Sequence, residues 1–220
     1  MERYIIFDCE TDGNGTFNPP TQNIVQLSWI VVELKEDDEH YKMQIVKERD
    51  RFLKDTTTEI KWGGHGITME KLKKDGKKAS KILARFASDF NKCDVAIAHN
   101  INFDMGCIKR LIKLKNLDIR LSKKVIQFDT MKNIKIQKHV NLYIDTKYGR
   151  KLKWPKLIEL SEKCELDCSI FTFHNSLEDC KALLGCLRYL VKKNIISLRK
   201  NTTNEIHNLT NSISRINIHI

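Results

Sequence analysis

The chain has 220 residues and a formal net charge of +11, with 41% apolar and 30% charged residues. This composition is typical of a globular protein with one sizeable core, and it excludes an intrinsically disordered chain. No apolar run is long enough to span a bilayer, and the N-terminus leads directly into a strand-like segment, so we expect no membrane partner and no signal peptide.

Three predicted strands open the chain. Residues 3–9 (RYIIFDC) are apolar, residues 24–34 (IVQLSWIVVEL) give a longer strand, and residues 40–53 give a third after a short acidic turn, KEDDEH. Consecutive strands joined by short connections are typical of an antiparallel meander.

Helices and strands then alternate. A short helix is predicted in TMEKLKKDG, where Gly76 stops it, and further strands are predicted at 94–100 and 124–130. This order predicts an α/β fold with a mixed five-stranded sheet, antiparallel first and then parallel, flanked by helices. The longer predicted helices span residues 78–92, 103–116, 155–166 and 176–195.

Two segments lack a regular pattern. Residues 131–153 are rich in Lys, Tyr and His without clear periodicity, so we expect a loop or an irregular insertion there. We assign residues 1–196 to one domain and residues 197–220 to a polar C-terminal tail, whose composition is compatible with mobility.

The cysteines form an odd set without a CxxC pair. Such a set indicates reduced, buried thiols rather than disulfides or a zinc site. We therefore expect an intracellular protein, and the sequence does not distinguish the cytoplasm from the nucleus. The seven residues are Cys9, Cys93, Cys107, Cys164, Cys168, Cys180 and Cys186.

The positive charge favours an anionic partner. Lysines and arginines recur through residues 71–81, 109–124 and 147–156. Nucleic acid is the usual partner of such segments, because phosphates are the densest anions available. A solvated lysine surface is the alternative explanation.

Two acids, Asp8 and Glu10, lie at the end of the first predicted strand, in YIIFDCETDG. Side chains two positions apart leave the same face of a strand. Two carboxylates placed in this way repel unless a cation lies between them, and oxygen ligands suit Mg²⁺ or Mn²⁺. A solvated end of an edge strand is the alternative explanation of this pair taken alone.

A third acid, Asp104, follows the apolar strand in AIAHNINFD. Asn102 is expected to cap a helix that carries Asp104 in its first turn. An acid there also complements the helix dipole, so this signal alone has a structural explanation.

A fourth acid, Asp179, lies in FHNSLEDCKALLGCLRYL. Asn175 and Glu178 fit a capping box, which predicts a helix from about Ser176 with Asp179 in its first turn. His174 then lies in the preceding loop, where a surface or capping role is the alternative.

Taken together and in this order, Asp8-x-Glu10, Asp104 and His174-x₄-Asp179 resemble the DEDD superfamily of 3′–5′ exonucleases. The histidine spacing is similar to that of the DEDDh, or DnaQ-like, subgroup. The resemblance covers residues 8–179, and the 131–153 segment has no counterpart in it. Further similar elements are HGIT at 65–68, FDT at 128–130 with Asp129, and WPKLIELSEKC at 154–164.

The resemblance implies a ribonuclease H-like fold and release of nucleoside 5′-monophosphates from a 3′ end. It implies two Mg²⁺ or Mn²⁺ ions held by the four acids Asp8, Glu10, Asp104 and Asp179, with His174 as the general base. The residues implied to lie near the terminal nucleotide are Thr11, His65, Asn100 and Phe103.

Physical chemistry agrees with this implied site. Phosphodiester hydrolysis develops negative charge on the attacking and leaving oxygens, and two divalent ions about 3.5–4 Å apart stabilise it. Four carboxylates offset the four positive charges of two such ions. A histidine titrates near neutral pH, which suits it to accept the proton of the attacking water.

We therefore predict an exonuclease that acts on single-stranded or frayed 3′ ends, with DNA slightly favoured over RNA. The alternatives are an exoribonuclease that trims RNA and, with less support because all five catalytic-type residues are present, an inactive nucleic-acid-binding accessory module. A polymerase or another replication or repair protein is the candidate protein partner.

Overall fold

The computed structural model describes residues 2–16, 20–36 and 41–198. The centre of the predicted acidic turn and the predicted tail from residue 199 onward lie outside the described residues. Within them, no helix is both long and apolar enough to cross a bilayer.

A mixed five-stranded sheet forms the centre of the fold, with the strand order β3-β2-β1-β4-β5. The first three strands pair antiparallel, whereas β4 pairs parallel with β1 and β5 parallel with β4. This arrangement confirms the predicted sheet. The strands are β1 (Glu2–Thr11), β2 (Ile24–Glu36), β3 (Tyr41–Phe52), β4 (Val95–Ala98) and β5 (Ile126–Asp129).

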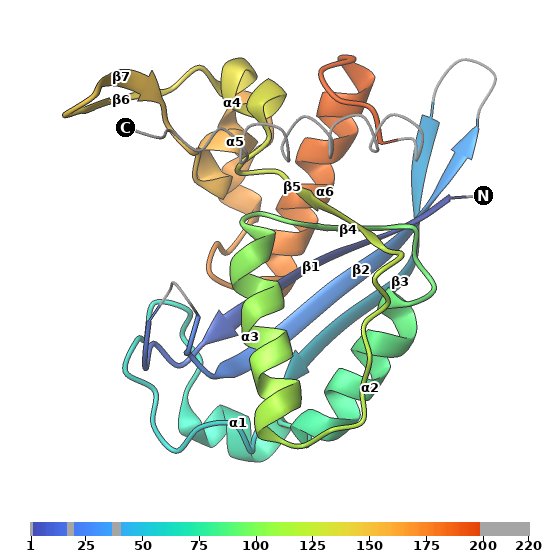
Figure 1. The fold of residues 1–220 in the computed structure, drawn as a ribbon, viewed down its shortest axis with the longest axis vertical. Coiled ribbons are helices and arrows are strands. Elements are labelled where there is room, and N and C mark those ends of the chain that lie inside the picture. Colours follow the sequence, from blue (N-terminus) through green and yellow to red (C-terminus); the bar gives the residue numbers. More distant parts are fainter. Residues whose placement is uncertain (1, 17–19, 37–40, 199–220) are drawn as a thin grey trace, which may run out of the picture.

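Helices cover both faces of this sheet (Figure 1). The predicted helices all form, with ends that differ by at most three residues from the predicted ones. A short 3₁₀ helix, Cys168–Ile170, precedes the last helix. The helices are α1 (Met69–Asp75), α2 (Ala79–Phe90), α3 (Ile101–Leu114), α4 (Ile134–Val140), α5 (Leu157–Lys163) and α6 (Ser176–Lys192).

The central strand β1 is buried on both faces because its side chains alternate between two cores. Ile5, Phe7 and Cys9 pack on one face with α2 and α3. Tyr4 and Ile6 pack on the other face with α4, α5 and α6. Cys9 therefore points into the core, in agreement with the expected buried thiols. All seven cysteines are free thiols, and six of them are buried.

The expectation of a loop at residues 131–153 is wrong. Asn133 caps the short helix α4 by accepting hydrogen bonds from the backbone N–H groups of Lys135 and Ile136. A hairpin of β6 (Tyr143–Thr146) and β7 (Gly149–Leu152) follows. Both of its strands are exposed, so they lack the apolar alternation by which a half-buried strand is recognised.

The predicted cap of α3 is also wrong. The helix begins at Ile101, and the residue at its cap is Asn100, in the left-handed region with φ 76°. The backbone N–H of Asn100 donates to Asp129 Oδ1 at 3.2 Å, at the end of β5. A neighbouring strand therefore fixes this helix start, and no local sequence pattern reports such a contact.

Helix α6 depends on apolar packing against the sheet. We expect Leu187→Ala to lower the free energy of unfolding by about 2–5 kcal/mol, because Leu187 is 1% exposed and its loss leaves a cavity. The melting temperature should fall by about 5–15 °C.

Leu114→Ala, at the end of α3, is the matched control, because Leu114 is 55% exposed. It should change stability by no more than about 0.5 kcal/mol. Equal melting temperatures for the two variants would contradict this account of the core.

Candidate active site

Three carboxylates meet at the carboxyl end of β1. Asp8 and Glu10 leave the face of β1 that α6 covers, and Asp179 lies in the first turn of α6. Oxygens of these three residues lie within 4.8 Å of one another. The fold therefore brings together acids that are about 170 positions apart in the chain.

The N-terminus of α6 holds Asp179 in place. Asn175 Oδ1 accepts from the backbone N–H groups of Leu177 at 3.1 Å and Glu178 at 3.4 Å, as expected for a capping residue. The Glu178 carboxylate pairs with Lys181 at 2.9 Å, so the predicted capping box forms only in its Asn175 half. Asp179 Oδ2 accepts from the backbone N–H of His174 at 3.2 Å.

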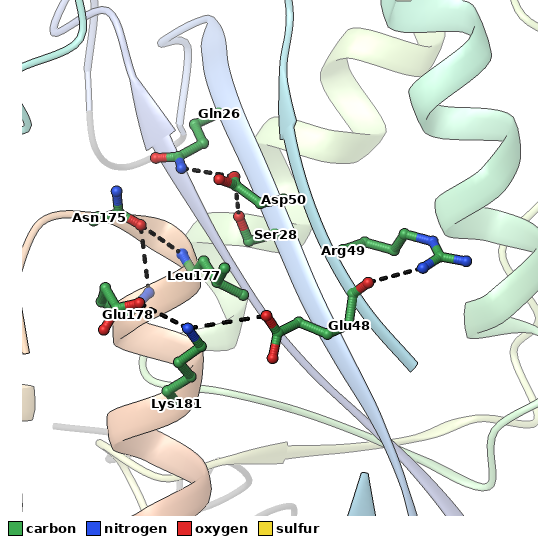
Figure 2. Close-up of polar contacts among 9 residues, drawn as sticks. All are labelled: Gln26, Ser28, Glu48, Arg49, Asp50, Asn175, Leu177, Glu178 and Lys181. Carbon is green, nitrogen blue, oxygen red and sulfur yellow. Dashed lines mark hydrogen bonds and ion pairs between the residues drawn. The ribbon is translucent and has the colours of Figure 1, made fainter. Parts of the chain in front are cut away.

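A buried hydrogen-bond network joins the start of α6 to the sheet, and Figure 2 shows its β2–β3 part. Gln26 Oε1 accepts from the backbone N–H of Ser176 at 3.3 Å, and the hydroxyls of Ser28 and Ser176 share a hydrogen bond of 2.6 Å. Asp50 Oδ1 accepts from Gln26 Nε2 at 2.8 Å and from Ser28 Oγ at 2.9 Å. The sequence analysis missed this network.

The strand register connects this network to the acids. Ser28 lies opposite Asp8, and Gln26 lies opposite Glu10. Directly opposed residues of an antiparallel pair point to the same face. The network therefore lies beside the carboxylates and fixes the separation between α6 and β1.

Asp104 approaches the same strand end from α3. Its Oδ1 accepts from the backbone N–H of Cys9 at 3.0 Å and from the Cys9 thiol at 3.1 Å. These bonds hold Asp104 against the backbone between Asp8 and Glu10, and it is not one of the three acids that converge within 4.8 Å.

The pKa of every one of these acids is raised. Burial, and then the charges of Asp104, Asp179 and Glu10, raise the pKa of Asp8 well above its usual range. Burial, and then the charges of Asp179 and Asp104, raise the pKa of Glu10 to about 8. Burial raises the pKa values of Asp104 and Asp179 to about 7, although hydrogen bonds from Cys9 and His174 oppose the shift.

The donor set fits a divalent metal ion. Among the described residues, Asp179 Oδ1 is buried and has no hydrogen-bond partner. An unpaired buried carboxylate oxygen is costly, and a cation offsets both that cost and the repulsion among the acids. Hard oxygen ligands of this kind suit Mg²⁺ or Mn²⁺.

A loop after β3 covers the edge of the site. The Asp12 carbonyl accepts from the backbone N–H groups of Lys61 at 2.8 Å and Trp62 at 3.3 Å. His65 Nδ1 accepts from the backbone N–H of Ile67 at 3.0 Å, which leaves Nε2 to donate to the Thr11 carbonyl at 3.1 Å. The His65 ring is therefore neutral, in agreement with a pKa that burial lowers.

Trp62 links the two histidines. Its ring meets that of His65 at a centroid distance of 4.9 Å and that of His174 at 5.3 Å, both edge-on. The exposed His174 has φ 67° and lies just before α6, so its ring reaches the loop side of the site. The sequence analysis missed Trp62, and its only local signal is the surrounding WGGHG. A Cβ on Gly64 would lie 2.4 Å from the Trp62 ring.

The other predicted nucleotide contacts lie at the same edge of the sheet. The Thr11 side chain is buried, and its hydroxyl donates to Gln22 Oε1. Asn100 and Phe103 are both half-buried and lie at the start of α3, close in the chain to Asp104. The structure thus places Thr11 at the end of β1 with His65 bonded to its carbonyl, whereas Asn100 and Phe103 lie at the start of α3.

The family model described as exonuclease (RNase_T) matches residues 5–187. This chain belongs to that exonuclease family. The match confirms the resemblance to DnaQ-like exonucleases, a family of nucleases that generally uses divalent metals. None of the curated proteins matches the chain.

A solved structure agrees with this fold. The crystal structure of cell-death related nuclease 4 (CRN-4) superposes with a TM-score of 0.60 at 12% identity, over 88% of this chain and 64% of that one. This exonuclease chain therefore spans less than two thirds of that nuclease. The likeness confirms the ribonuclease H-like fold. The Thermus thermophilus RuvC structure gives a TM-score of 0.35 at 8% identity, over 86% of this chain and 96% of that one.

The raised pKa values predict a pH-dependent stability of the metal-free exonuclease. Carboxylates ionise near pH 4 in an unfolded chain but at about 7 to 8 for Glu10, Asp104 and Asp179 in the folded one. The folded state therefore holds more protons between these limits, and stability falls as pH rises through this window. The melting temperature without metal should decrease between about pH 6 and about pH 8.

Binding of a metal ion should reverse this loss of stability at higher pH. Mn²⁺ or Mg²⁺ at about 100 times its Kd should raise the melting temperature by about 5–10 °C. Asp8→Asn should weaken both the pH response and the metal response. Asp118→Asn changes an exposed acid and should keep both. An equal metal shift in these two variants would count against a metal site at Asp8.

Proposed function

We propose that this protein is a metal-dependent 3′–5′ exonuclease that hydrolyses phosphodiester bonds from the 3′ end of a nucleic acid and releases nucleoside 5′-monophosphates. The observation that carries the proposal is the convergence of Asp8, Glu10 and Asp179 within 4.8 Å, with His174 hydrogen-bonded to Asp179 through its backbone. The family supports a nuclease, and this geometry supports the choice of residues.

Asp8, Glu10 and Asp179 would hold the metal, together with Asp104 from α3. Two divalent ions bound there would supply electrostatic stabilisation of the negative charge that develops on the attacking and leaving oxygens. The hydrogen bonds from Cys9 to Asp104 and from His174 to Asp179 orient each carboxylate before substrate binds.

His174 is the proposed general base. Its ring is exposed and lies in a loop, so it can approach a water molecule at the scissile phosphate. The edge-on contact with Trp62 orients the ring, and the bond from its backbone N–H to Asp179 keeps the loop beside the carboxylates. Proton transfer by a positioned histidine typically contributes about 10²–10⁴-fold to a rate.

Trp62, His65, Thr11, Asn100 and Phe103 would surround the terminal nucleotide. Trp62 is exposed beside His174, and an aromatic ring is a sequence-tolerant stacking partner for a base. The preferred substrate is a single-stranded or frayed 3′ end, because an unpaired terminal nucleotide can leave the duplex, enter the site and stack on a side chain. DNA is slightly favoured over RNA, and a polymerase or another replication or repair protein is the candidate partner.

Trimming of RNA is the second candidate. The same carboxylates serve either nucleic acid, so the choice depends on how the pocket receives the 2′-hydroxyl. An inactive binding module is the weaker alternative, because all four acids and His174 are present and the acids lie in the geometry described above.

Labelled oligonucleotides test the reaction and its direction. With Mg²⁺ or Mn²⁺, a 5′-labelled single strand should shorten by one nucleotide at a time, whereas chelation of the metal should stop the reaction. Asp8→Asn should lower kcat by at least about 10³-fold, because one ligand is lost. His174→Ala should lower it by about 10²–10⁴-fold. Parallel DNA and RNA substrates measure the preference.

Asp118→Asn is the control for a lost acid and should keep the wild-type rate, because Asp118 is exposed in the loop after α3. Loss of a 5′ label as the first product would overturn the 3′–5′ direction. Tight binding without hydrolysis under either metal would favour the accessory module.

A further inference from the structure

The β6–β7 hairpin carries exposed aromatic rings. It forms a sheet of its own, separate from the central one, and Figure 1 shows it projecting from the body beyond α4 and α5. Tyr148 is 86% exposed, Trp154 just after β7 is 57% exposed, and Tyr143 is 45% exposed. Rings this exposed contribute little to the core, so their place on a projecting arm requires another explanation.

Each of these rings has a cation beside it. A positive charge over an aromatic face places a phosphate-binding group and a base-stacking surface at the same point. The distances to the ring centroids are 4.9 Å for Lys147 Nζ over Tyr148, 4.6 Å for Arg150 Cζ over Tyr143 and 5.3 Å for Lys132 Nζ over Trp154.

The charge of the hairpin is mostly uncompensated. Residues 143–156 contain five lysines and arginines but one acid, Asp145. In the part of the chain that the structure describes, Lys153 pairs with Glu159, and no carboxylate lies within ion-pair distance of Lys147, Arg150 or Lys151. The arm therefore offers positive charge to a partner.

Protection against aggregation explains only half of this pattern. Lysines on exposed strand edges discourage pairing with another chain. Exposed Tyr143, Tyr148 and Trp154 have the opposite effect, because they add apolar surface. Cations and aromatic rings together suit the binding of a single-stranded nucleic acid, since the cations pair with its phosphates and the rings stack on its unpaired bases.

The base of the hairpin is tied to the carboxyl end of β4, the strand next to β1. His99 Nε2 donates to the Pro155 carbonyl at 2.8 Å, and His99 follows β4 immediately before α3, which carries Asp104. Each hairpin strand has four residues and spans about 13 Å at about 3.3 Å per residue. A strand with its 3′ end among the carboxylates can therefore reach the hairpin with its upstream nucleotides.

We propose that the β6–β7 hairpin is an arm that binds the single-stranded nucleic acid upstream of the 3′ end. Tyr143, Tyr148 and Trp154 stack on its bases, and Lys147, Arg150 and Lys151 contact its phosphates. This inference rests on the proposed function, because it takes the partner to be the substrate strand. It assigns a role to the segment that has no counterpart in the family resemblance.

Binding of a fluorescein-labelled oligothymidylate of about 20 nucleotides, followed by anisotropy without divalent ions, tests the arm. The combined variant Lys147→Gln, Arg150→Gln and Lys151→Gln should raise Kd by about tenfold or more at moderate salt. The slope of log K against log salt should become shallower by about 2, because each lost phosphate contact on a single strand removes about 0.7.

A matched variant removes three exposed lysines elsewhere: Lys92→Gln, Lys123→Gln and Lys124→Gln. These residues precede β4 and β5, at the amino edge of the sheet, away from the carboxylates. This variant should change Kd by less than about twofold. If both triple variants weaken binding equally, the basic surface acts only through its net charge, and the arm is refuted.

Tyr148 tests the stacking half of the proposal. Tyr148→Ala should raise Kd by about tenfold with little change in salt slope, and Tyr148→Phe should restore the affinity because it keeps the ring. Equal affinity of the Ala and Phe variants would overturn stacking on Tyr148.

Hydrolysis separates this inference from the proposed function. With Mn²⁺, the hairpin variant should raise KM at least about fivefold more for the long strand than for a dinucleotide, which is too short to reach the arm. An equal increase in KM on both substrates would refute the arm and leave the proposed exonuclease function unaffected. A wild-type protein that binds the strand but hydrolyses neither substrate would refute the exonuclease, and the comparison of binding between variants would still decide the arm.

Discussion

The repulsion among the carboxylates at the end of β1 is the interaction that the rest of the structure has to offset. Asp8, Glu10 and Asp179 lie within 4.8 Å of one another, and Asp104 lies against the same strand. Burial, together with the neighbouring charges in the case of Asp8 and Glu10, raises the pKa values of these acids. The arrangement is stable because hydrogen bonds fix the elements that carry the acids, and because the site fits a cation.

Those bonds come from both faces of the sheet. On one face, Gln26 and Ser28 of β2, which Asp50 holds in place (Figure 2), hydrogen-bond to Ser176 at the start of α6. On the other face, the backbone and thiol of Cys9 hold Asp104 of α3. The central strand is thus clamped between two helix starts, each of which delivers one acid. The loop with Trp62 and His65 closes the third side by bonding to the backbone at the end of β1.

The charge of the protein is distributed in keeping with this site. A chain with a net charge of +11 places four of its acids at one strand end. The β6–β7 hairpin carries cations and exposed rings. Under the proposed function, the hairpin would attract an anionic polymer, which could occupy the acidic site only together with cations. This division explains how one surface can favour a phosphate backbone while its reacting centre is built from carboxylates.

The sequence by itself determined the elements with strong periodicity and the order of the acids. The sheet strands and the main helices follow from apolar patterns. The candidate site residues follow from a motif that is recognised by residue type and spacing in the sequence: Asp8, Glu10, Asp104, Asp179 and His174. Asn175 was recognised as a cap because its partners are two and three residues away.

Only the tertiary structure decided the contacts between distant segments. The Gln26–Ser176 bond, the left-handed start of α3 at Asn100 and the meeting of Trp62 with His174 join residues whose local sequence has no pattern that requires them. The β6–β7 hairpin was missed because both of its strands are exposed and lack a buried face. Apolar periodicity in a sequence arises from a buried face, so an element that is exposed on both faces shows no such periodicity.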